Sequence, residues 1–172
     1  MAIALRDPRL YIRSILIASP EPNELQKADI AEVCLSLAAA DEALPWLEGS
    51  WRDEERRLAL QARALVARGD TKQFLEIRRR QWEVSGTWSA LEDYLESLSA
   101  EQRPAVLEAA KRRAQEADDV LVGLEVLLGL DDLAAADLLI VQRHKELHGR
   151  FYRRLSDMLE TSSPGNSYWR LR

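Results

Sequence analysis

The chain has 172 residues, of which 47% are hydrophobic and 31% charged, a composition typical of a globular protein and opposed to extended disorder. Its formal net charge of −5 disfavours nonspecific binding to nucleic-acid phosphates. Glycine (7) and proline (6) are sparse, and residues that favour helices outnumber the β-branched residues typical of strands. The composition therefore predicts an all-α protein that does not bind nucleic acid.

The N-terminal part of the chain predicts three helices. Asp7, followed by proline, is typical of a helix start, and the prolines after Ser19 end this first helix. Asn23 caps a second helix. A short helix is expected from about Asp41 to Glu48, with Pro45 tolerated because it falls near the first turn. The second helix has a buried stripe at helical spacing, formed by Ile30, Val33, Cys34 and Leu37.

The next segment predicts a helical hairpin. Ser50 and Asp53 are interpreted as the cap and the acidic first turn of its first helix. Gly69 is expected to end that helix in the left-handed conformation, and Thr71 is expected to begin the second helix. Residues 85–87 are expected to form the next turn between helices. The side chains expected to face inward are Leu58, Ala62, Leu65, Val66, Phe74, Ile77 and Val84.

Five more helices are expected after this break. The first has an inward stripe of Trp88, Leu91, Leu95 and Leu98. The second spans about 105–116, with Val106, Leu107 and Ala110 buried. Residues 120–130 are apolar nearly all round, which predicts a helix at the centre of the core. The fourth begins at Asp131 and reaches His144 or beyond, and the fifth carries Phe151, Leu155 and Met158.

A repeat with an offset of about 30 residues predicts how these helices are arranged. Because a single helix pair cannot bury its apolar face, such repeats stack. We therefore expect one domain over residues 1–172, built of about nine or ten helices as antiparallel hairpins in a short α-solenoid. Residues 161–172 are interpreted as a turn and the partial helix of a truncated next repeat. The residue pairs at this offset are Leu35 and Leu65, Leu44 and Phe74, and Leu47 and Ile77.

Two resemblances support the same architecture. The segment from Leu58 to Val84 resembles a degenerate tetratricopeptide repeat. Ala62 lies where that family has a small residue for close helix contact, and Phe74 departs from the family by replacing the small residue usual early in the second helix. Three longer blocks, residues 28–49, 64–98 and 133–160, resemble a bacterial family of long all-helical proteins labelled as a domain of unknown function. The resemblance implies a helical-repeat fold and brings no catalytic residues with it.

The chain offers few candidates for chemistry. The lone Cys34 excludes an intramolecular disulfide and favours a reducing, cytoplasmic location. His144 and His148 are four apart on an expected helix and could face one metal ion, as in a metal-binding protein or hydrolase. Lys145 replaces the glutamate that a zincin motif needs, so two surface histidines are the favoured interpretation. We expect no cofactor, no catalytic residues and no membrane span.

A noncatalytic interaction module is the leading functional prediction, because stacked helix pairs create surfaces that bind protein or peptide partners. The candidate partner-binding residues are Arg78, Arg79, Trp82 and Trp169. Packing in the core is the favoured role for Trp82, whereas Trp169 has the best claim to exposure. The basic clusters are interpreted first as solvated surface suited to helix ends. Self-association through exposed solenoid ends is the structural alternative.

Overall fold

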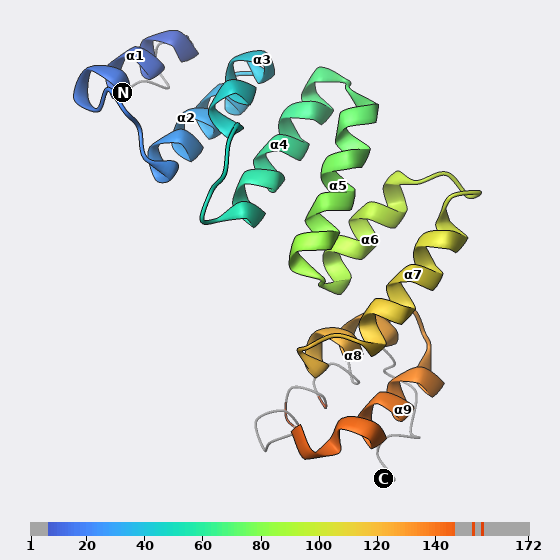
Figure 1. The fold of residues 1–172 in the computed structure, drawn as a ribbon. Helices are drawn as coiled ribbons and strands as arrows, with labels where there is room; N and C mark the ends of the chain where they lie inside the picture. Colours follow the sequence, from blue (N-terminus) through green and yellow to red (C-terminus); the bar gives the residue numbers. More distant parts are fainter. Residues whose placement is uncertain (1–6, 147–152, 154–155, 157–172) are drawn as a thin grey trace. The chain divides into compact units, whose positions relative to one another are not determined.

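The computed structural model describes residues 7–146, Arg153 and Ser156, and Figure 1 shows its ribbon. Every regular element in this described part is helical, which confirms the all-α prediction. The chain divides into two compact units, one ending at Ser85 and one beginning at Gly86, and each is described separately. The expectation of a single domain stays a prediction.

The first unit opens with two capped helices, as predicted. In α1 (Pro8–Ala18) the Asp7 carboxylate accepts the Arg9 backbone N–H at 2.9 Å. In α2 (Glu24–Ser36) Asn23 and Gln26 form a reciprocal capping box, each side chain bonded to the other's backbone. These bonds satisfy backbone donors that the first turn of a helix leaves free.

The helix expected over 41–48 is two consecutive turns instead. α3 (Ala40–Ala43) is followed by a 3-10 helix, η2 (Leu44–Leu47), with Pro45 in its first turn. Proline has no backbone N–H and its ring opposes the carbonyl four residues before it, which accounts for the change of helix type. Leu47 at the end of η2 is nevertheless fully buried.

α4 (Glu54–Arg68) and α5 (Thr71–Ser85) form a hairpin (Figure 1). Gly69 ends α4 with a φ of 78°, in the left-handed conformation that the sequence predicted. The cap of α4 is Asp53, which accepts the Arg56 N–H at 3.0 Å, and the prediction of Ser50 was wrong. The preceding segment is held outside the helix because the Arg52 N–H donates to Glu24 of α2 at 2.8 Å.

α4 is buried on more than one side because it contacts α2 and α3 as well as α5. Leu58, Ala62 and Leu65 are buried as predicted, and Leu60 packs in the core around α2. Val66 and Val84 were predicted to face inward and are instead 62% and 45% exposed. Ala64, Leu65 and Val66 follow one another along the helix and point in different directions, so they cannot all face inward. Ala64 and Leu65 are buried, and Val66 lies on the exposed side of α4.

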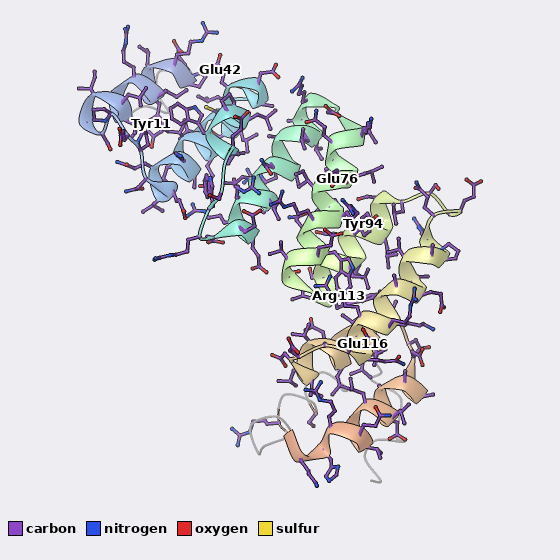
Figure 2. All side chains as sticks on the ribbon, in the orientation of Figure 1. Tyr11, Glu42, Glu76, Tyr94, Arg113 and Glu116 are labelled. Atoms are coloured by element: carbon purple, nitrogen blue, oxygen red, sulfur yellow. The ribbon has the colours of Figure 1, made fainter. Side chains whose placement is uncertain are left out.

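The core of the first unit is built around α2. Tyr11, which Figure 2 labels on α1, packs against this core together with Ile12 and Ile15. Its buried members come from α2, α3, η2, α4 and the segment before α4, and they are Ala28, Ile30, Ala31, Cys34, Ala43, Leu47, Trp51 and Leu60.

The second unit is centred on α8 (Val120–Gly129), which contacts α6 (Trp88–Ser97), α7 (Arg103–Gln115) and α9 (Leu133–Arg143). The prediction of a central apolar helix is confirmed for this unit, with buried residues on several sides of α8. A 3-10 turn, η3 (His144–Glu146), follows α9. The helix predicted to carry Phe151, Leu155 and Met158, and the segment 161–172, lie outside the described residues.

Two glycines let helices approach α8 closely. A Cβ at Gly123 would lie 2.2 Å from the carbonyl oxygen of Ala114 in α7, and one at Gly129 would lie 2.2 Å from the Trp88 ring in α6. Both distances are far below van der Waals contact, so these contacts require glycine. Separately, none of the described helices combines the length and apolar character needed to cross a membrane.

Candidate partner-binding surface

The predicted basic residues of the candidate surface lie in the middle of α5. Arg79 is 48% exposed and is held between two carboxylates of its own helix. Its guanidinium donates to Glu76 at 3.2 and 2.5 Å and to Glu83 at 3.1 Å. Glu76, labelled on α5 in Figure 2, has its pKa lowered by the hydrogen bond from Arg79. This part of α5 is therefore a charge ladder rather than a basic patch.

Arg78 and Trp82 differ from Arg79 in their contacts and their burial. The Arg78 guanidinium carbon lies 5.2 Å from the centroid of the Phe74 ring, a cation–π contact, and the guanidinium donates to Gln81 at 3.0 Å. Trp82 is 7% exposed, so its ring offers little surface to a partner and takes the packing role that the sequence favoured. The structure therefore does not bring Arg78, Arg79 and Trp82 together on one exposed face.

Arg80 joins a polar network that sequence reasoning missed. It pairs with Glu54 of α4 at 2.8 Å, and Glu54 also receives both ends of the Arg57 guanidinium. Arg57 is 5% exposed and donates in addition to the Leu47 carbonyl at 3.1 Å. The Arg57 hydrogen bond is the main cause that lowers the pKa of Glu54. The spacing of Glu54 and Arg57, i and i+3 on a helix, was the available signal.

The second basic cluster, Lys111–Arg113, lies near the end of α7, and Arg112 and Arg113 occupy its last turn. That position agrees with the helix-dipole interpretation, unlike the mid-helix position of Arg78–Arg80. Lys111 pairs with Asp132, the N-cap of α9, at 2.9 Å. Arg143 donates to the carbonyl oxygens of Ala117 and Asp118 at 2.6 and 3.0 Å. These cations therefore bind α9 to the end of α7.

The histidine candidate has one member in the described part of the chain. His144 is exposed, lies in η3 and has Nδ1 3.0 Å from the Val141 carbonyl oxygen. His148 and Trp169 lie outside the described residues. Within the described ranges, no three side chains among His, Cys, Asp and Glu are grouped so that they could hold a metal ion.

The lone thiol lies in the core of the first unit. Cys34 is fully buried, and burial raises its pKa to about 11, with a further contribution from the Glu42 carboxylate. The thiol is therefore protonated near neutral pH, which is the unreactive state. Glu42, labelled in Figure 2, accepts a hydrogen bond from Arg9 at 3.0 Å and thereby joins α3 to α1.

The helix faces and ion pairs described above are the candidate recognition surfaces of residues 7–146. Comparisons of the chain with protein-family models, with curated proteins and with solved structures find no match.

Proposed function

We propose that the chain is a noncatalytic protein–protein interaction module that binds a protein or peptide partner on the outward face of α5. The observation that carries the proposal is the exposure of this helix. Trp82 is the one buried residue among the 15 of α5, although the helix packs along α4 as a hairpin. A helix that is anchored on one side and open on the other presents a rigid surface to a partner.

The charge ladder gives this face a distinct chemistry. Glu76, Arg79 and Glu83 alternate in sign along exposed turns of the helix, and the partly exposed Val84 lies beside them in the sequence. We propose a partner segment of mixed charge with an apolar residue, because opposite charges across an interface favour one register over others. The resemblance to tetratricopeptide repeats supports the proposal at the level of fold analogy.

The test compares two arginines of the same hairpin. The immobilised full chain is exposed to cytoplasm from its source organism, and retained proteins are quantified. Arg79→Gln removes the centre of the ladder, whereas Arg63→Gln removes an exposed arginine from α4 and serves as the control. We expect a partner that wild type and Arg63→Gln retain equally and that Arg79→Gln retains at about one tenth or less, since a charge at a specific contact contributes about 1.4 kcal/mol or more. Repeated recovery of no partner would contradict the proposal, and equal retention by both variants would exclude the α5 face.

A further inference from the structure

One face of α9 is buried and the opposite face carries exposed aliphatic side chains. Ala136 and Leu139 are 0% and 2% exposed on the side of α9 that meets α8. Leu138 and Val141 are 53% and 60% exposed, and Ala134, one turn before Leu138, is exposed as well. Three apolar residues at spacings of four and three lie on one side of a helix, so α9 has a continuous apolar face toward solvent.

A charge of opposite sign stands at each end of this face. Asp131 precedes α9 and Lys145 follows it in η3, and both are exposed. Within the described part of the chain neither belongs to an ion pair. Ala134, Leu138 and Val141 are spaced by four and three residues, as on a helix face that packs along another helix. Asp131 and Lys145 lie just beyond the two ends of α9, in the turn before its N-cap and in η3. We call these five residues the α9 stripe.

The two charges are equidistant from Leu138, because Asp131 and Lys145 each lie seven residues from it, whereas Ala134 and Val141 lie four and three residues from it. When two such stripes cross antiparallel at Leu138, each Asp131 meets the Lys145 of the other copy. A parallel pairing would instead place like charges side by side, which is destabilising. Antiparallel packing about a two-fold axis is also the symmetry of most protein dimers.

We infer that the α9 stripe is the docking surface for a second copy of this chain, packed antiparallel around Leu138. This inference shares with the proposed function only the view that the protein is an interaction module. The surface proposed here is on α9, whereas the partner-binding face is on α5. The stripe is about 21 Å long at 1.5 Å per residue, and one helix face buries less than the roughly 800 Å² per partner of a standard interface. We therefore expect a weak dimer, with a Kd of about 10 to 300 μM.

The first test is the concentration dependence of the mass. Sedimentation equilibrium of the full chain from about 5 to 500 μM should show a monomer–dimer equilibrium with a Kd in the expected range. Leu138→Asp places a charge at the centre of the crossing and should raise Kd at least about tenfold. Ile17→Asp, at a position of α1 that is 79% exposed, is the matched control and should leave Kd unchanged. A wild type that is monomeric throughout, or a dimer that tolerates Leu138→Asp, would overturn the inference.

The second test concerns the orientation of the two helices. Lys145→Glu should raise Kd about three- to tenfold and more than Lys145→Gln does, because only glutamate repels Asp131 of the second copy. The double variant Asp131→Lys with Lys145→Glu exchanges the charges and should return Kd to within about twofold of wild type. Asp131 has a φ of 56°, so the melting temperature of each variant is compared with wild type.

If the double variant that exchanges the charges has a lower melting temperature than wild type, the comparison of Kd between Lys145→Glu and Lys145→Gln decides instead. Equal Kd values for these two variants would overturn the antiparallel arrangement. Failure of self-association is separable from failure of the proposed function. A chain that stays monomeric and yet loses its partner on Arg79→Gln overturns this inference alone.

Discussion

Arg57 shows how one buried charge depends on its neighbours. Its guanidinium bonds both oxygens of Glu54 and the Leu47 carbonyl, so each end of the group has an acceptor. Removing one partner of a buried ion pair costs more than the pair itself contributes, because the remaining charge stays out of water. Arg57 therefore joins α4 to η2, and the ionised Glu54 keeps the charge of Arg57 paired.

We predict that Glu54→Gln lowers the free energy of unfolding by about 1–2 kcal/mol, less than for a fully buried pair. Glu76→Gln breaks a pair of the same i, i+3 spacing whose two side chains are 48% and 60% exposed, and it should change stability little. Urea unfolding followed by circular dichroism at pH 7 measures both variants. Equal losses for the two would contradict the role assigned to Arg57.

The same pair predicts a dependence on pH. The hydrogen bond from Arg57 lowers the pKa of Glu54 in the folded protein, so its contribution is present above the unfolded value of about 4.3. The contribution is lost as the pH falls through the lowered folded pKa. The difference in unfolding free energy between wild type and Glu54→Gln should therefore be constant from pH 7 to about 5 and shrink below about pH 4. A difference that stays constant down to pH 3 would contradict this assignment.

Cys34 gives a third prediction about a single residue. With its pKa at about 11 and no exposed surface, the thiol should not react with Ellman's reagent at pH 8 on the time scale of a free thiol. In about 6 M guanidinium chloride one thiol per chain should react at once, which is the control. Rapid labelling of the native protein would mean that the core around α2 opens readily.

The sequence predicted the ends of helices correctly where the signal is local. It missed a helix end that is set by a tertiary contact. Asn23 and Gly69 act through their own side chain or backbone freedom, and both predictions are confirmed. The start of α4 is at Asp53 rather than Ser50 because Glu24, 28 residues before Arg52, holds the intervening backbone. No local pattern contains that contact.

The candidate site was less predictable than the helices. Arginine on a helix usually indicates a surface position, and both Arg57 and Arg79 have a glutamate three residues earlier. That spacing indicates an ion pair in each case, but it does not show that Arg57 is buried and Arg79 exposed. The distinction depends on which acceptors the fold brings near each residue, namely the Leu47 carbonyl for Arg57 and the exposed Glu83 for Arg79. Periodicity likewise indicates the buried direction but not the width of the buried face, which is why Val66 was assigned wrongly.

The close contact between α7 and α8 leads to a prediction about the stability of the protein. Gly→Ala inside a helix usually stabilises by about 1 kcal/mol, but at Gly123 the new methyl group would meet the backbone of Ala114 at 2.2 Å. We predict that Gly123→Ala destabilises by about 2–3 kcal/mol, as overpacking does. Gly69→Ala is the control, with φ of 78° but no atom within 4 Å, and should cost about 1 kcal/mol.

Thermal unfolding of the Gly123→Ala and Gly69→Ala variants measures this order. A Gly123→Ala protein at least as stable as wild type would mean that α7 and α8 are further apart than described.

For the whole molecule, the division at Ser85 and Gly86 is the feature that the repeat pattern did not predict. The 30-residue offset compares residues 34–49 with 64–79, and both segments lie within the first unit. The pattern therefore describes how the first unit is built and contains no information about where a compact unit ends. That boundary depends on which helices pack against one another over long range. In the sequence, its only sign is the predicted loop between helices at residues 85–87.

The first unit should fold without the second, because the buried residues of its core cluster around α2 all lie within residues 28–60. We predict that a fragment of residues 1–85 is helical by circular dichroism and unfolds cooperatively on heating, as an autonomous unit does. Within the fragment, Leu47→Ala should destabilise by about 2–4 kcal/mol, because Leu47 is fully buried, whereas Leu25→Ala, at a position 60% exposed, should change stability little. A fragment without a cooperative transition, or with equal losses for the two variants, would mean that the first unit acquires its packing only in the complete chain.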